Sequence, residues 1–353
     1  MVPWGLPGDP DLPRGAGHGP RRRRRALQRR GHAARRALGR RSGALEGRRR
    51  AQGGGRGPGA SPGPRGFAVN ERPHRSGVVA LLGRPNAGKS TLLNRLLGQK
   101  LAIVTAKPQT TRSRILGIVT REDAQLLLLD TPGFHASEKA LNRALIEVVD
   151  DVAQDCDVAV LLVDPRHGWD EAHEALRERL RARHTPCLVV STKADLRAPP
   201  EDAPIDLALS ARTGEGTRGL VDRLVELLPE GPAFYDPEQV TDRSLRFLAA
   251  ELVREAAFEA LSQEIPYETA VEIESFDESD PRVTRIRATL LVEKKSQKGM
   301  VVGKGGRMIR EIGIQARRGL EELLEKQVHL ELWVKVEPRW TKRPNRLKSL
   351  GYH

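Results

Sequence analysis

Residues 83–90 read Gly-Arg-Pro-Asn-Ala-Gly-Lys-Ser, and they lie between the apolar run Val78–Leu82 and a stretch with helical periodicity. The segment fits the pattern G-x-x-x-x-G-K-[ST] in the strand–loop–helix context that the pattern requires. In such a loop the backbone N–H groups point toward phosphate oxygens, and the helix N-terminus adds the positive end of its dipole. Lys89 would place its ammonium group on the outer phosphates, and the Ser90 hydroxyl could ligate Mg²⁺. The predicted phosphate site consists of Gly83, Arg84, Pro85, Asn86, Ala87, Gly88, Lys89, Ser90 and Thr91.

From Gly77 to about residue 230, short apolar runs alternate with stretches of helical periodicity. The expected strands are 78–82, 115–119, 126–129, 158–163, 188–191 and 207–209, and the expected helices are 89–97, 139–154, 170–183 and 216–228. This alternation predicts an α/β domain at 77–230, with a mostly parallel sheet and helices on both of its faces.

Three later motifs in this domain specify the nucleotide. Asp130-Thr131-Pro132-Gly133 ends an apolar run 41 residues after Lys89, so the carboxylate suits the outer shell of Mg²⁺ and the Gly133 N–H suits the γ-phosphate. In Thr192-Lys193-Ala194-Asp195 the last carboxylate can accept from guanine N1 and N2 together, which adenine does not allow. The Lys193 stem can lie over the base, and the backbone at Ser210-Ala211 can reach guanine O6. The motifs therefore predict GTP and GDP, with Mg²⁺, as the ligands.

With these motifs, the domain resembles the Era family in the translation-factor-related group of small GTPases. The segment Lys107-Pro108-Gln109-Thr110-Thr111-Arg112 resembles the family's switch-I motif, and Asp130-Thr131-Pro132-Gly133-Phe134-His135 is also similar to the family's sequence. The resemblance implies that Thr111 ligates Mg²⁺ in the GTP state, which gives Ser90, Thr111 and Asp130 as the metal ligands. Thr192 stands where the family usually has Asn. Because Thr is shorter, we expect a weaker tie between this loop and the phosphate loop.

The residues leave the route of hydrolysis open. Ras-like GTPases orient the attacking water with a Gln after D-x-x-G, but Phe134 occupies that position, so we expect slow self-catalysis. A partner surface could order the switches, or K⁺ could act in place of an arginine finger. Related GTPases that use K⁺ hold it through the Asn of this loop, which implies Asn86 here. The candidate catalytic residues are Lys89, Thr111, Gly133 and Asn86.

A second domain is expected at 242–338, after a linker at 231–241. A helix of about 20 residues from Asp242 precedes strands at 267–276 and 283–293. The second of these strands alternates apolar residues with Arg285, Arg287 and Thr289, so one face is expected to be buried and the other wet. Residues 300–309 read Met-Val-Val-Gly-Lys-Gly-Gly-Arg-Met-Ile and resemble the G-x-x-G loop of KH domains. With a helix at about 314–326 and a strand at 328–336, the order α-β-β-α-α-β is that of an α+β type II KH domain.

A KH loop clamps about four nucleotides of single-stranded RNA, since its glycines let the chain approach phosphates closely. The predicted RNA-binding residues are Lys298, Gly303, Lys304, Gly305, Gly306, Arg307 and Arg310. A solvated basic surface and a tight helix–helix turn without a ligand are the alternatives. For Trp333, on the polar face of the last strand, stacking on a base and packing against a neighbouring segment are both open. The basic tail at 339–353, with Trp340 as a candidate anchor, is open between RNA contact and disorder.

The formal net charge of +14 comes from residues 1–76, which hold 19 Arg, no Lys and 4 acidic residues, whereas residues 77–353 have a net charge of −1. This uneven distribution excludes a uniformly basic nucleic-acid wrapper. Residues 1–76 are rich in Arg, Gly and Pro and lack apolar periodicity, so we expect them to be disordered. The favoured interpretation is upstream sequence translated from a misplaced start, with the true start near Val69. A phosphate-binding arm and an organellar transit peptide are the alternatives.

The scarcity of cysteine, with only Cys156 and Cys187, suits a reducing compartment, and no apolar run is long enough to cross a bilayer. We therefore expect a cytoplasmic protein without a transmembrane segment. The residues alone predict a GTP switch joined to a single-stranded RNA clamp. The resemblance, over about residues 77–345, implies binding to the 3′ end of small-subunit (16S) ribosomal RNA and a role in 30S subunit assembly. The rivals are an RNA scaffold that binds GTP without significant turnover and a nucleoid or peripheral membrane-surface protein acting through the Arg-rich segment.

Overall fold

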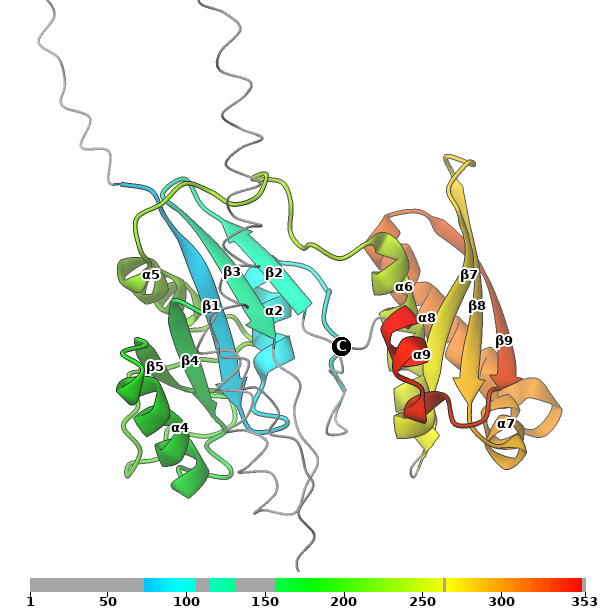
Figure 1. Cartoon of the computed structure of the whole chain (residues 1–353), viewed down its shortest axis with the longest axis horizontal. Coiled ribbons are helices and arrows are strands. Elements are labelled where there is room, and N and C mark those ends of the chain that lie inside the picture. The colour runs from blue at the N-terminus through cyan, green and yellow to red at the C-terminus, as the bar shows by residue number, and fades with distance from the viewer. Residues whose placement is uncertain (1–72, 106–114, 131–155, 263–264, 351–353) are drawn as a thin grey trace, which may run out of the picture. The chain divides into compact units, whose positions relative to one another are not determined.

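The computed structural model describes residues 73–105, 115–130, 156–262 and 265–350 (Figure 1). The switch-I motif at 107–112, the expected helix at 139–154 and the N-terminal segment lie outside these ranges.

The first domain is built on a six-stranded sheet with the order β2-β3-β1-β4-β5-β6. Its strands are β1 (Arg75–Gly83), β2 (Ile115–Thr120), β3 (Ala124–Asp130), β4 (Val158–Val163), β5 (Cys187–Ser191) and β6 (Leu207–Ala208). Within the described residues, β2 is the only strand of this sheet that runs antiparallel to its neighbour. Central strands such as β4 are apolar throughout because both of their faces are buried. The predicted mostly parallel sheet is confirmed.

Helices cover both faces of this sheet. α2 (Lys89–Leu97) and α5 (Thr217–Leu227) lie on one face, and α4 (Glu171–Ala182) lies on the other (Figure 1). Alternate residues of β1 belong to two separate cores: Val79 clusters with Leu92 and Leu220, whereas Ala80 clusters with Leu176. The alternation follows from the period of two in a strand, and the two cores fix β1 and the loop that follows it.

The segment 231–241, the expected linker, is bound along the first domain. The side-chain oxygen of Gln125 accepts the N–H groups of Phe234 at 2.7 Å and Tyr235 at 2.9 Å. Thr241 Oγ1 donates to the carbonyl of Leu116 at 2.7 Å. These bonds hold the segment against β2 and β3.

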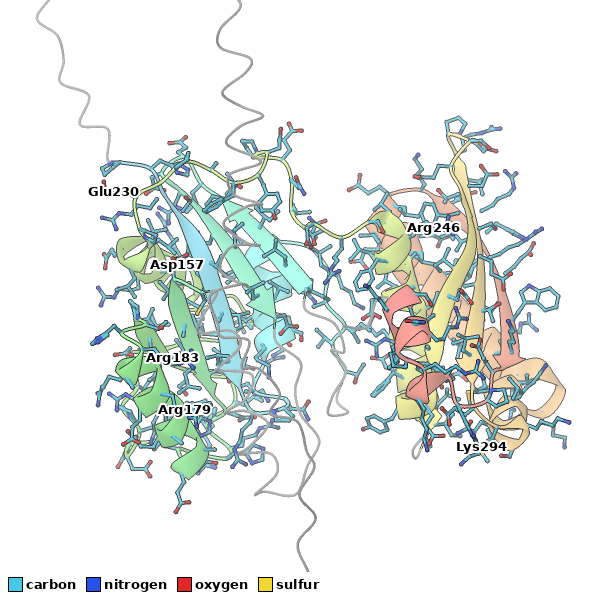
Figure 2. All side chains as sticks on the ribbon, viewed as in Figure 1. Asp157, Arg179, Arg183, Glu230, Arg246 and Lys294 are labelled. Carbon is cyan, nitrogen blue, oxygen red and sulfur yellow. The ribbon has the colours of Figure 1, made fainter. Side chains whose placement is uncertain are left out.

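The second domain packs helices on a three-stranded sheet with the order β7-β8-β9. Its elements are α6 (Leu245–Ala260), η1 (Ile265–Glu268), β7 (Ala270–Asp277), β8 (Val283–Val292), α7 (Lys295–Val302), η2 (Lys304–Gly306), α8 (Arg307–Leu324) and β9 (Gln327–Val336). β8 is antiparallel to β7 and parallel to β9. Arg246 on α6 reaches the sheet and donates to the carbonyl of Ile273 at 2.8 Å (Figure 2). The predicted α-β-β-α-α-β order is confirmed.

Helix α8 begins at Arg307, seven residues before the expected start near residue 314. Gly306, with φ +78°, is its N-cap, and the buried positions Ile312, Ala316 and Leu320 recur every four residues. The helix therefore starts directly at the glycine loop.

The C-terminal residues 339–350 fold over the face of the sheet opposite to the helices, through η3 (Trp340–Lys342) and α9 (Pro344–Ser349). Trp340 is buried in a cluster with Ala270 and Leu291, and its Nε1 donates to the carbonyl of Glu268 at 3.3 Å. Arg346 on α9 forms ion pairs with Glu272 at 2.7 Å and Glu337 at 3.0 Å. The described part of the tail is thus anchored by Trp340.

The structure corrects the expectation that one face of β8 is wet along its whole length. Arg285 and Arg287 are exposed, as predicted, but Thr289 is buried. Its hydroxyl donates to Glu274 Oε1 at 2.5 Å. The alternation of polar residues predicted a wet face through Thr289, but only its first half, at Arg285 and Arg287, is solvated.

Candidate functional site

The loops that carry the predicted nucleotide residues meet at one edge of the first sheet. β1 leads into the loop that starts at Gly83, β3 ends at Asp130, β5 leads into Thr192 and β6 is followed closely by Ser210. Because these strands are parallel, their carboxyl ends lie together, where open α/β sheets bind ligands.

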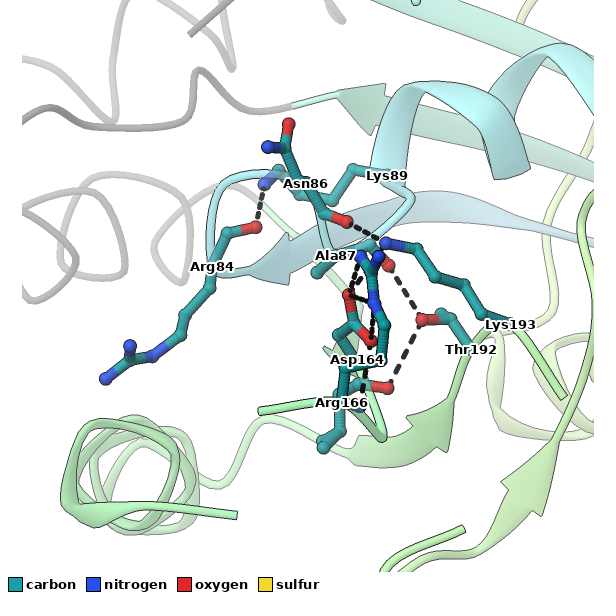
Figure 3. Close-up of polar contacts among 9 residues, drawn as sticks. Arg84, Asn86, Ala87, Lys89, Asp164, Arg166, Thr192 and Lys193 are labelled. Atoms are coloured by element: carbon teal, nitrogen blue, oxygen red, sulfur yellow. Dashed lines mark hydrogen bonds and ion pairs between the residues drawn. The ribbon is translucent and has the colours of Figure 1, made fainter. Parts of the chain in front are cut away.

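The phosphate loop has a backbone conformation that requires glycine at its first position. Gly83 has φ +143°, and a Cβ there would lie 2.7 Å from the carbonyl oxygen of Leu162. Lys89 Nζ donates to the carbonyls of Gly83 at 2.9 Å and Arg84 at 3.0 Å, and the Arg84 side chain points away from the loop (Figure 3). Burial lowers the pKa of Lys89, and the Asp130 carboxylate opposes that shift. The ammonium group is thus held inside the loop that is predicted to receive phosphate.

Two of the three predicted metal ligands lie together. Ser90 Oγ donates to Asp130 Oδ2 at 2.7 Å, and Asp130 is fully buried. A hydroxyl beside a carboxylate fits the oxygen ligands that Mg²⁺ takes. Thr111 lies outside the described residues, and so do Thr131, Pro132, Gly133 and Phe134. Nowhere in the described ranges are three or more His, Cys, Asp or Glu side chains placed together to hold a metal ion.

Thr192 connects the predicted guanine-recognition loop to the phosphate loop. Its buried Oγ1 lies 2.9 Å from the carbonyl oxygen of Ala87 and 3.2 Å from that of Val163, so one hydroxyl proton is shared between two acceptors. The short side chain therefore does reach the phosphate loop (Figure 3). Whether this tie is weaker than one made by Asn stays a prediction.

Lys193 spans the two loops through a network that sequence reasoning missed. Its Nζ donates to the carbonyl of Asn86 at 2.6 Å and to Asp164 Oδ2 at 2.7 Å (Figure 3). Burial raises the pKa of Asp164, but hydrogen bonds from Arg166 and Lys193 outweigh burial and hold that pKa well below its ordinary value. The ionised carboxylate therefore fixes the lysine stem. The sequence did contain a signal for Asp164, because this residue, like Asp130, comes at the end of a buried parallel strand.

The residues predicted to recognise guanine also lie together. Ser210 Oγ donates to Asp195 Oδ1 at 2.5 Å, and Arg212 Nε donates to Asp195 Oδ2 at 2.9 Å. The bond from Ser210, followed by that from Arg212, lowers the pKa of Asp195, so this carboxylate is ionised and can accept. The N–H of Ala194 donates to the carbonyl of Leu209 at 3.0 Å, which joins the two loops.

Arg95, on α2, holds the backbone of the loop that contains Ala211 and Arg212. Its Nε donates to the carbonyl of Ala211 at 2.7 Å, and a terminal guanidinium nitrogen donates to the carbonyl of Arg212. Arg95 belongs to no motif and lies 116 positions from Ala211, so only the fold reveals its role.

In the second domain, the predicted glycine loop joins α7 to α8. Gly303, Gly305 and Gly306 have φ of +72°, +61° and +78°, and a Cβ at Gly303 would lie 2.7 Å from Met308 Cβ. Lysine and arginine side chains of the predicted set are exposed at and beside this loop, namely Lys298, Lys304, Arg307 and Arg310. Their role in RNA binding stays a prediction.

A groove of about 520 Å³ lies between α8 and β9 and begins three residues after the glycine loop. Its lining consists of Ile309, Arg310, Gly313, Ile314 and Arg317 on α8 and Leu330 and Leu332 on β9. Aliphatic walls with two arginines suit unstacked bases attached to a charged backbone. Of these residues only Arg310 was predicted, because apolar residues in a helix or a strand read equally well as core.

Comparisons with known proteins match both domains. Residues 78–193 match the family described as 50S ribosome-binding GTPase, and residues 264–341 match the KH domain family. GTPase Era of Nitratidesulfovibrio vulgaris strain DP4 is 43% identical over 303 residues, with 80% of this chain and 98% of that protein covered. This chain belongs to the Era family of GTPases. GTPase Era of Syntrophus aciditrophicus strain SB, 40% identical, covers 79% of the chain and matches over 95% of its own length.

Two Era crystal structures share this fold. One, in complex with MgGDPNP and nucleotides 1506–1542 of 16S ribosomal RNA, has a TM-score of 0.71 at 34% identity and covers 79% of this chain and 99% of its own. A substituted variant of Aquifex aeolicus Era bound to GDP·AlF4⁻ has a TM-score of 0.70 at the same identity and coverage. As an Era-family GTPase, the chain converts GTP and water to GDP and phosphate. None of the helices in the described ranges combines the length and hydropathy needed to span a membrane.

Proposed function

We propose that the chain is a GTP-driven switch that binds the 3′ end of 16S ribosomal RNA and assists 30S subunit assembly in the cytoplasm. The observation that carries the proposal is the joining, in one chain, of a guanine-nucleotide site to a glycine loop with an adjoining groove. The Era structure that contains 16S nucleotides 1506–1542 matches this chain over both domains.

In the nucleotide step, the phosphates of GTP would lie on residues 83–91 and the base against Asp195 and Lys193. Mg²⁺, when bound, neutralises charge on the β- and γ-phosphates, and Ser90, Thr111 and Asp130 would hold it. Lys89, already inside the loop, would stabilise the charge that develops during transfer. The described geometry at Lys89 and Asp195 therefore supports binding and orientation of GTP.

The attacking water needs a further group, because Phe134 has no polar side chain. We propose that RNA binding orders the switch segments and that K⁺ supplies the missing positive charge through Asn86. The Asn86 side chain points away from the Asp164 cluster (Figure 3), so its use by a cation would not disturb the Lys193 network.

In the RNA step, backbone phosphates would approach Gly305 and Gly306 at the N-terminus of α8, where the helix dipole favours anions. The exposed cations beside the loop add attraction that falls with salt. Bases would enter the groove between α8 and β9.

A second candidate function is an RNA scaffold that binds GTP without significant turnover, and the apolar Phe134 favours it. Turnover by the full chain separates the two functions. It is measured with and without an RNA that carries the 3′-terminal sequence of 16S ribosomal RNA, in KCl and in NaCl. We expect RNA to raise turnover and KCl to raise it further.

Gly305→Asp is the control variant for this experiment. Asp tolerates a positive φ better than most residues, no atom lies within 4 Å of the added Cβ, and its charge repels phosphate. This variant should keep basal turnover and lose stimulation by RNA. Tight binding of GTP and RNA without turnover in either salt would establish the scaffold instead.

A further inference from the structure

The face of the KH sheet opposite to the helices has one tryptophan packed onto it from the tail and one exposed on its own strand. Trp340 is 1% exposed, whereas Trp333 on β9 is 62% exposed. A single exposed apolar side chain is ordinary on a protein surface. A function for Trp333 must therefore be argued from the residues that surround it.

Exposed cations flank Trp333 on the same face. In the β8–β9 register Trp333 is opposite Thr289, and the adjacent pairs on this face are Arg287 with Glu331 and Leu291 with Lys335. The Arg287 and Lys335 side chains are exposed. On this face of the sheet, the exposed indole ring thus lies between the register positions of Arg287 and Lys335.

The carboxylates of this face are already engaged. Glu331 pairs with Arg287 at 3.0 Å, and its carboxylate lies 3.5 Å from His329 Nε2. Glu272 pairs with Arg346 at 2.7 Å, and Glu274 accepts from the Thr289 hydroxyl. Arg287 and Glu331 therefore offset each other, and Lys335 is the further exposed cation beside Trp333 on this face.

Trp333 is also continuous with the groove. β9 is an edge strand of the sheet formed by the described residues (Figure 1). Leu330 and Leu332 line the groove, and Trp333 is the next residue along the chain, on the opposite face because side chains alternate. An RNA strand that leaves the groove and turns around this edge therefore reaches the face that carries the indole.

We propose that Trp333 is a stacking platform for a base of single-stranded RNA that lies outside the groove, with Arg287 and Lys335 beside its phosphates. The inference rests on the proposed RNA-binding function and extends it. The platform lengthens the bound RNA beyond the roughly four nucleotides of a KH clamp. Stacking tolerates any base, so this position adds affinity without sequence preference.

The test compares two single-stranded RNAs of about 5 and about 12 nucleotides, the shorter filling the groove and the longer reaching past β9. In the full chain, Trp333→Ala should weaken binding of the longer RNA by about 5- to 150-fold and leave the shorter one unchanged. Trp333→Phe should retain most of the affinity, because a ring remains. The longer RNA should quench tryptophan fluorescence in the wild type and less in Trp333→Phe.

Gly305→Asp, which acts at the clamp, should weaken both RNAs, and Trp169→Phe, in the first domain, should weaken neither. If the wild type binds both RNAs and Trp333→Ala binds them equally well, the platform is wrong while the proposed function stands. If Trp333→Ala weakens both RNAs alike, its effect lies in the groove and the platform is also wrong. If the wild type binds neither RNA, the proposed function fails and this inference fails with it.

Discussion

A nucleotide-binding motif identifies the residues that contact the ligand, but the geometry of the loops is set by individual hydrogen bonds between the loops themselves. Thr192 is such a case, because its hydroxyl is shared between the carbonyls of Ala87 and Val163. Removing the hydroxyl would leave the buried carbonyl of Ala87 short of a donor, which is costlier than the bond is worth, whereas the carbonyl of Val163 would still accept from the backbone N–H of Thr192 at 2.9 Å.

We therefore expect Thr192→Val, which keeps the shape of the side chain, to destabilise the first domain by about 1–3 kcal/mol. Nucleotide affinity should fall as well, because one of the two described side-chain ties between the loop that carries Asp195 and the phosphate loop is lost, and only the bond from Lys193 to Asn86 remains. Thermal unfolding with and without GDP, together with GDP titration, measures both effects, at roughly 2–4 °C per kcal/mol for a domain of this size. Thr192→Ser is the matched control, since it keeps the hydroxyl. Valine and serine variants with the same melting temperature would show that the shared bond is unimportant.

At the same scale, the sequence predicted Lys89, Asp130, Asp195 and Ser210 because each stands in a motif next to its strand. The structure brings these residues to one edge, as the parallel order requires. Arg95 could not be predicted, because its partners are fixed by packing of α2 against a loop far along the chain.

The elements of the second domain show where periodicity is informative and where it is not. The alternation in β8 predicted a strand with one buried face, and the core residues Ile286, Ala288 and Leu290 confirm that face. The opposite face has two environments: Arg287 is exposed to solvent, and Leu291 is covered by the tail. A local pattern cannot show which segment returns to cover a sheet, so the order of residues 339–350 was left open by the sequence.

We expect Trp340→Ala to destabilise the KH domain by about 3–5 kcal/mol, because it opens a cavity beneath the tail. Urea unfolding followed by far-ultraviolet circular dichroism measures the loss. Trp333→Ala is the matched control on the same face of the sheet, and it should cost no more than about 0.5 kcal/mol as an exposed position. Equal losses for the two variants would contradict the burial that distinguishes them.

At the scale of the whole molecule, a nucleotide site and an RNA clamp in one chain form a switch only if each ligand changes affinity for the other. GTP, through Thr111 and Gly133, is proposed to order the two switch segments and to favour the arrangement that binds RNA. Hydrolysis would release those segments and lower RNA affinity. Linkage then requires that RNA favours GTP over GDP by the same factor.

We expect the full chain to bind the 3′-terminal 16S sequence about 5- to 150-fold more tightly with GDPNP and Mg²⁺ than with GDP and Mg²⁺. The measurement closes a thermodynamic square, with RNA titrated into each nucleotide state and each nucleotide titrated with and without saturating RNA. The two coupling factors must agree within error, and Gly305→Asp should reduce both toward one. Identical RNA affinities in the two nucleotide states would mean that the sites act independently, and the chain would then be a GTPase tethered to RNA rather than a switch controlled by it.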